Sequence, residues 1–212
     1  MSGLLRYTVL SDGSSDRALL YPIRWALMEM AVPVESAQWA DLRILPSPPP
    51  VSDLAACAKR ALELYPAELL LIHRDAEVAS LEERVEEIRK KVSDVIEHYV
   101  AIVPVRMTEA WLLHDESAIR CASDNPNGKV GLSLPKPKRV EQESDPKETL
   151  KTALCVASEY QGRRLKKLRQ EFGIRRARTA ELIQDFSPLC GVPSFKAFLS
   201  ALEAALKRLG HL

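Results

Sequence analysis

The chain has 212 residues, 46% of them hydrophobic and 28% charged, and its formal net charge is +1. This length suits one domain with a sizeable core, and the near-neutral charge means that attraction to nucleic acid can come only from local clusters of Lys and Arg. The absence of a secretory leader and of any run of about 18 apolar residues, together with widely spaced cysteines, predicts a cytoplasmic protein that does not enter a membrane.

The first half of the chain alternates short apolar runs with amphipathic segments. Residues 5–10 predict a buried strand that ends in a turn rich in Ser, Asp and Gly, and apolar side chains recur at helical spacing from Asp16 to Met30. Alternating strands and helices favour right-handed crossovers, so we predict an α/β fold with a Rossmann-like, mostly parallel sheet flanked by helices. The same criteria predict further strands over 38–45, 68–73 and 100–105, and further helices over 53–65 and 80–99.

The second half of the chain is predicted to be mainly helical. A short helical segment follows over 109–115, and residues 123–144, rich in Pro, Gly and Lys, predict a loop insertion. C-terminal helices are expected within 147–209, over 149–160, 162–172, 179–186 and 194–209. Since no repeat or clear boundary interrupts the pattern, we expect one domain over 1–212 with a helical C-terminal part.

Acidic residues follow the first and the third predicted strands. Asp12 and Asp16 bracket the first turn, and Asp75 and Glu77 come directly after the apolar run 68–73. If the two strands are neighbours, these carboxylates meet at the C-terminal edge of the sheet, where ligands of parallel sheets bind. Carboxylate oxygens suit Mg²⁺ or Mn²⁺. The structural alternatives are a plain turn, a helix cap at Asp16 and a solvated loop after the third strand.

Two later residues are further candidates. Glu109 is a candidate additional metal ligand, although a carboxylate at a helix N-terminus is equally well explained by the helix dipole. Lys147 is a candidate for stabilising charge on a phosphate during phosphoryl transfer. The run Asp145-Pro146-Lys147-Glu148 also matches an ordinary helix start, with Asp as the cap and Pro in the first turn. Both interpretations stay open.

Basic residues cluster between 163 and 178. This cluster would form a local positive surface with a salt-dependent affinity for nucleic acid, or else a solvated helix face. The candidate nucleic-acid contacts are Arg163, Arg164, Lys166, Lys167, Arg175 and Arg176.

The order of these motifs resembles the Toprim fold shared by topoisomerases, primases and nucleases of the OLD (overcoming lysogenization defect) type. The resemblance rests on the strand-turn-helix unit around Asp12-Gly13-Ser14-Ser15-Asp16 and on the apolar strand that ends in Asp75-Ala76-Glu77. Together with the segment from Glu109 to Asp115, Asp145-Pro146-Lys147 and the helix that begins at Ser194, the chain resembles an uncharacterised family of small bacterial Toprim-like proteins. The family pattern has Glu where Asp12 stands and favours Asp where Glu77 stands, so the number of carboxylates is kept.

The resemblance implies a metal-dependent nuclease that hydrolyses phosphodiesters of DNA or RNA, in a defence or DNA-repair setting. Asp12, Asp75 and Glu77 would be the core Mg²⁺ or Mn²⁺ ligands and Asp16 an additional one. A first alternative is a catalytically inactive, nucleic-acid-binding or regulatory subunit of an ATPase partner, since the chain has no phosphate-binding loop of its own. A second alternative is a phosphohydrolase for small phosphate esters.

Overall fold

Four strands form one all-parallel sheet. The structure, a computed structural model, describes residues 3–212 except for the side chains of residues 14 and 15, so those two positions of the predicted acidic turn lie outside the described side chains. The sheet order is β2-β1-β3-β4, with β1 at Leu5–Leu10, β2 at Val34–Ala40, β3 at Leu69–His73 and β4 at Tyr99–Ile102. The predicted α/β fold with a parallel sheet is confirmed.

The first and third strands are direct neighbours in this sheet. Their register places Tyr7 opposite Leu69 and Leu10 opposite Ile72. All five residues of β3 are buried, as expected for a central strand covered on both faces. The acidic residues were expected to meet only if these two strands are neighbours. The structure meets this condition, and the two strands end side by side.

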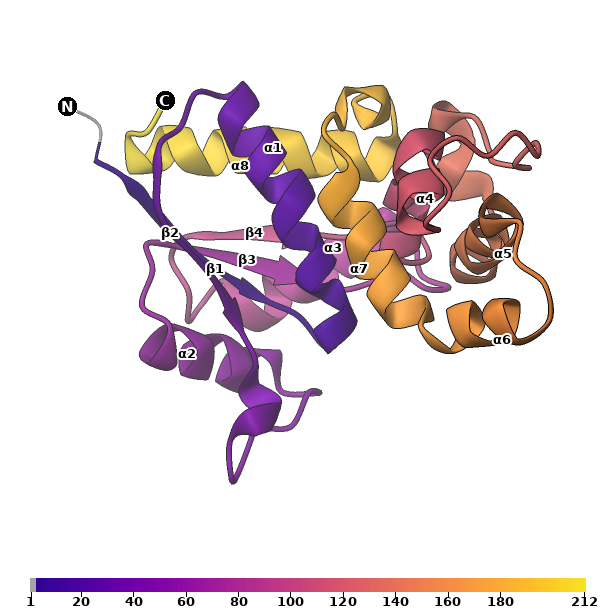
Figure 1. The fold of residues 1–212 in the computed structure, drawn as a ribbon. Helices are drawn as coiled ribbons and strands as arrows, with labels where there is room; N and C mark the ends of the chain where they lie inside the picture. The colour runs from indigo at the N-terminus through magenta and orange to yellow at the C-terminus, as the bar shows by residue number, and fades with distance from the viewer. Residues whose placement is uncertain (1–2) are drawn as a thin grey trace.

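Helices cover both faces of the sheet (Figure 1). Tyr7 and Val9 of β1 face a core that includes residues of α1 (Leu20–Glu29) and α8 (Pro193–Leu209). Leu10, on the alternate face, packs with residues of α2 (Leu54–Leu64) and α3 (Leu81–Val92). The strand period of two thus assigns neighbouring residues of β1 to two separate cores.

The C-terminal half forms a helical layer beside the sheet, and α8 returns from it along β4 (Figure 1). In the core of this layer the rings of Trp111 and Phe195 pack edge to face, with their centroids 4.9 Å apart. Among the helices of residues 3–212, none is long and apolar enough to cross a membrane. The elements of this half are η3 (Thr108–Leu112), α4 (Glu116–Ala122), η4 (Pro137–Gln142), α5 (Pro146–Ser158), α6 (Gly162–Gln170), α7 (Phe172–Leu182) and η5 (Ser187–Leu189).

Two predicted elements of the first half end earlier than expected. The strand predicted over 38–45 stops at Ala40, because the Asp41 carboxylate accepts a hydrogen bond from the Arg43 amide and caps the 3-10 helix η2 (Leu42–Ile44). The helix predicted over 80–99 stops at Val92, after which the chain turns into β4. The strand thus ends at a side-chain cap, and α3 ends in a backbone turn in which the Ile96 amide donates to the Val92 carbonyl at 2.9 Å.

Three predictions for the second half also differ from the structure. The helix predicted over 179–186 begins earlier, as α7 at Phe172. Helix α4 was not predicted at all; the Asp115 carboxylate caps it by accepting from the Ala118 amide. The predicted loop insertion contains the short helix η4, and its Val140 is fully buried in the main core. Only tertiary packing explains why this polar segment is drawn into the core.

Candidate active site

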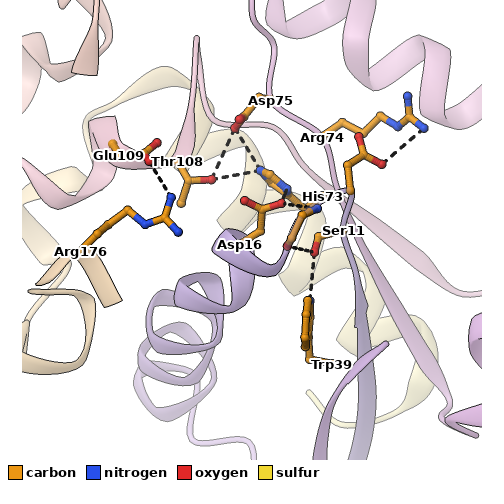
Figure 2. A network of polar contacts seen from close by, with 11 residues as sticks. Ser11, Asp16, Trp39, His73, Arg74, Asp75, Thr108, Glu109 and Arg176 are labelled. Atoms are coloured by element: carbon orange, nitrogen blue, oxygen red, sulfur yellow. Dashed lines mark hydrogen bonds and ion pairs between the residues drawn. The ribbon is translucent and has the colours of Figure 1, made fainter. Parts of the chain in front are cut away.

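The C-terminal ends of β1 and β3 open into one small pocket of about 180 Å³ (Figure 2). All four carboxylates that the sequence singled out at these strand ends contribute to its walls. We call this the acidic pocket; its lining residues are Asp12, Asp16, His73, Arg74, Asp75, Glu77 and Arg84.

His73 links the two sides of the acidic pocket. It is the last residue of β3 and is almost fully buried, with Nδ1 3.4 Å from Asp16 Oδ2 and Nε2 3.2 Å from Asp75 Oδ1. Thr108 adds a hydroxyl that donates to the same Asp75 oxygen at 3.4 Å. Burial lowers the pKa of His73, but the contacts with Asp16 and Asp75 outweigh it and raise the pKa to about 9. His73 is therefore an imidazolium at neutral pH and holds the two carboxylates in place.

Arginine side chains form the outer wall of the acidic pocket. Arg74 Nη2 lies 3.6 Å from Asp12 Oδ1, and Arg84, from the first turn of α3, donates to the Ala76 carbonyl. Partial burial raises the pKa of Asp12, an effect that Arg74 opposes and the nearby carboxylates Asp16 and Asp75 reinforce. The carboxylates of β1 and β3 are therefore close enough to interact electrostatically.

Asp16 has a structural contact in addition to its place in the pocket. Its Oδ2 accepts a hydrogen bond from the Gly13 amide at 3.0 Å, which satisfies a donor at the start of the 3-10 helix η1 (Ser14–Leu19). Asp16 is therefore not the N-cap itself, which is Gly13, but the third residue of η1, and its carboxylate fixes the turn that brings the group to the pocket.

Glu77 stands in a strained backbone conformation at the rim of the acidic pocket. Its φ angle is +55°, in the left-handed region, and Arg106 in the neighbouring loop has φ +63°. The Glu77 amide donates to the Arg106 carbonyl at 3.1 Å, so the two strained positions support each other. Strain of this kind at a non-glycine residue is concentrated at functional loops.

Glu109 lies outside the acidic pocket. Its side chain is 5% exposed and its Oε1 accepts a 2.7 Å ion-pair hydrogen bond from Arg176, whose side chain is 11% exposed. Figure 2 shows this pair beside Thr108, to one side of the His73 network. Glu109 is thus engaged by an internal cation, and Arg176, a candidate nucleic-acid contact, is mostly buried in this pair.

The remaining candidates lie in the C-terminal helices. Lys147 is exposed in the first turn of α5, where Asp145 caps the helix by accepting from the Glu148 amide, and among the described residues it is not part of the pocket wall. Arg175 is tied to Asp124 and Glu171. Four of the six candidate nucleic-acid contacts are exposed, and all four lie in α6: Arg163, Arg164, Lys166 and Lys167.

Sequence reasoning missed His73, Arg74, Arg84 and Thr108 as parts of the site. His73 was considered only as a packed residue, without a paired metal spacing. The available signal was its position two residues before Asp75 at the end of an apolar strand, because residues i and i+2 of an extended segment point to the same side. Thr108 and Arg84 come from other elements and carry no sequence signal that links them to β3.

The donor set of the acidic pocket suits a hard divalent cation. Carboxylate oxygens from two strand ends face a space that holds several waters, since one water takes roughly 30 Å³ of liquid volume. Within the described part of the chain, no three Asp, Glu, His or Cys side chains stand in a ready coordinating arrangement. The residues that could hold an ion are Asp12, Asp16, Asp75 and Glu77.

Comparison of the chain with models of protein families, with curated proteins and with solved structures finds no match. The resemblance to Toprim-like proteins therefore rests on the sequence motifs alone and stays a prediction.

Proposed function

We propose that this protein is a Mg²⁺- or Mn²⁺-dependent phosphodiesterase that acts on DNA or RNA. The observation that carries the proposal is the meeting of four carboxylates and two arginines in one pocket at the ends of two adjacent parallel strands. This edge is where parallel sheets bind ligands, and a mixture of carboxylates and guanidinium groups suits a bound cation together with a phosphate.

The charges of the pocket support the same chemistry. With His73 protonated, three positive side chains face the four carboxylates of the pocket, and Glu87 also pairs with Arg74 and Arg84, which leaves an excess of two negative charges. A divalent cation would bring this sum to zero. When bound, the cation would neutralise charge on the phosphate and lower the pKa of a water molecule.

The protein's own residues have separate parts in this proposal. Asp12, Asp16, Asp75 and Glu77 would hold the ion, and Arg74 and Arg84 would bind phosphate oxygens. His73 would position Asp16 and Asp75 through its two ring nitrogens, and Thr108 would fix the orientation of the Asp75 carboxylate.

Nucleic acid is the proposed substrate because of the exposed basic face of α6. Its cations are surrounded by solvent, and their residues are Arg163, Arg164, Lys166 and Lys167. Contacts of this kind position a phosphate backbone without reading its sequence. The resemblance to OLD-type proteins adds the proposal of an ATPase partner, and the four free thiols are compatible with the reducing cytoplasm expected from the sequence.

The test is a calorimetric titration of Mg²⁺ and Mn²⁺ into the wild-type protein, Asp75→Asn and Asp94→Asn. Asp94 is exposed beyond the end of α3, at the opposite edge of the sheet, so it controls for the loss of one carboxylate. Each titration is run with and without a single-stranded oligonucleotide, because the substrate can complete a metal site. We expect at least tenfold weaker binding in Asp75→Asn, since even supporting residues of metal sites contribute 10–100-fold, and no change in Asp94→Asn.

Cleavage assays on plasmid, single-stranded DNA and RNA then separate the alternatives. Loss of metal-dependent cleavage in Asp75→Asn alone supports the proposal, whereas equal cleavage in all three proteins refutes the site. Binding of nucleic acid without metal binding or cleavage would favour the regulatory subunit. Turnover of p-nitrophenyl phosphate without cleavage of nucleic acid would favour a small-ester phosphohydrolase.

A further inference from the structure

A larger cavity adjoins the acidic pocket through η1. Asp16 lines the acidic pocket, while the next residues of η1, Arg17 and Ala18, line this cavity of about 540 Å³. Its other walls come from β1, β2, α1 and α7 and include Tyr7, Leu20, Tyr21, Arg24, Gly173 and Arg176. The volume falls within the range of roughly 300–1,000 Å³ that is usual for small-ligand sites.

Three guanidinium groups and no carboxylate line this cavity. Within the described part of the chain, Arg17 and Arg24 form no ion pair, and both are exposed to solvent. Arg176 donates to Glu109 through Nη1, while its buried Nε has no hydrogen-bond partner among the described residues. Glu109 balances the charge of Arg176, so Arg17 and Arg24 give the cavity its net positive charge, and a cleft with such an excess concentrates anions.

The rest of the wall is apolar and partly aromatic. Tyr7 is 2% exposed and forms the floor from β1, while Tyr21 and Leu20 line the side formed by α1. Burial raises the pKa of Tyr7 to about 12 and Arg24 lowers it, which places the Arg24 charge near this floor. A site that combines cations with apolar and aromatic walls suits a ligand with a phosphate and a planar, largely apolar body.

We propose that this cavity binds a nucleotide, with its phosphate held by Arg17, Arg24 and Arg176 and its base and sugar against Tyr7, Tyr21 and Leu20. The proposal concerns binding alone and holds whether or not the acidic pocket is catalytic. The ligand chemistry has two sources, a free mononucleotide or one unit of a nucleic-acid strand. The second source would place the neighbouring phosphodiester towards the acidic pocket, because Arg17 and Asp16 are adjacent in η1.

Two variants remove the site without removing its buried ion pair. Arg17→Gln/Arg24→Gln removes two exposed charges and leaves Arg176 with Glu109. Gly173→Leu fills the space instead: the position of its missing Cβ has no atom within 4 Å, and Leu has a higher helix propensity than Gly. Lys59→Gln/Arg60→Gln, at exposed positions of α2 on the other face of the sheet, removes the same charge outside the cavity.

The experiment is a calorimetric titration of dTMP, inorganic phosphate and a dT tetranucleotide into the full chain, without divalent cations so that metal binding is not involved. Circular dichroism confirms that each variant is folded. We expect dTMP or the tetranucleotide to bind at least tenfold more weakly to Arg17→Gln/Arg24→Gln, since one charge-assisted hydrogen bond accounts for about that factor. Gly173→Leu should show a similar loss, and the α2 variant Lys59→Gln/Arg60→Gln should bind dTMP like the wild type.

The outcomes separate the sources and the rival explanations. Binding of dTMP that the cavity variants abolish identifies a free nucleotide as a ligand, and binding of only the tetranucleotide identifies a strand. No binding of either, or unchanged binding in both cavity variants, overturns the proposal. Inorganic phosphate that binds as tightly as dTMP would show that the apolar wall is not used and would overturn the assignment of a nucleotide.

Discussion

Replacing Arg176 with Met should lower the free energy of unfolding by about 3 kcal/mol, because it leaves the Glu109 carboxylate buried without its counter-charge. The side chains of Glu109 and Arg176 are 5% and 11% exposed, and Glu109 Oε1 lies 2.7 Å from Arg176 Nη1. Removing one partner of a buried pair costs about 3–5 kcal/mol. We take the low end of this range because Arg176 borders the larger cavity, through which water can reach the Glu109 carboxylate once the guanidinium group is removed.

The matched variant is the double replacement Glu109→Met/Arg176→Met. Since apolar side chains of similar volume often replace a buried ion pair without loss, the double variant should regain most of the stability that Arg176→Met loses. Urea denaturation gives the free energies, and thermal unfolding should show a decrease of roughly 6–12 °C for Arg176→Met, at about 2–4 °C per kcal/mol for a domain of this size.

The same variants test the alternative role of Glu109 as a metal ligand. If Glu109 only balances Arg176, Mg²⁺ should stabilise Arg176→Met no more than it stabilises the wild type. A loss below about 0.5 kcal/mol in Arg176→Met, within the range of ordinary surface substitutions, would refute the reasoning from burial. Extra stabilisation of Arg176→Met by Mg²⁺ would return Glu109 to the list of metal ligands.

Two further predictions concern stability. The folded-state pKa of Tyr7, about 12, lies above the ordinary value of 10, so the stability that the neutral phenol contributes is fully present below pH 10 and is lost as the pH rises towards 12. In urea titrations, the decrease in unfolding free energy between pH 9 and 12 should therefore be smaller in Tyr7→Phe than in the wild type by about 2 kcal/mol. Equal decreases in the two proteins would contradict this. Phe195→Ala should lower the free energy of unfolding by about 3–5 kcal/mol in the same assay, because the ring is fully buried and its centroid lies 4.9 Å from that of Trp111. Phe172→Ala, at a half-buried position, should lower it clearly less. Similar losses in the two variants would contradict this prediction.

The sequence by itself determined the fold class and most of the element order. Strands β1 and β3 are short apolar runs bounded by turn residues, and α2, α3 and α8 have apolar stripes at helical spacing, so both signals depend only on neighbouring residues. The acidic residues at the ends of β1 and β3 were found in the same way. Boundaries were less accurate where side-chain caps such as Asp41 and Asp115 end or begin an element.

Only the tertiary structure decided which residues share a site. The order β2-β1-β3-β4 places Asp12 and Asp75 at neighbouring strand ends, a fact that no local pattern contains. It also buries His73 between carboxylates and pairs Glu109 with Arg176, 67 residues away. Contacts between distant segments depend on strand order and helix packing, which is why the sequence indicated the acidic residues but not the cations that neutralise them.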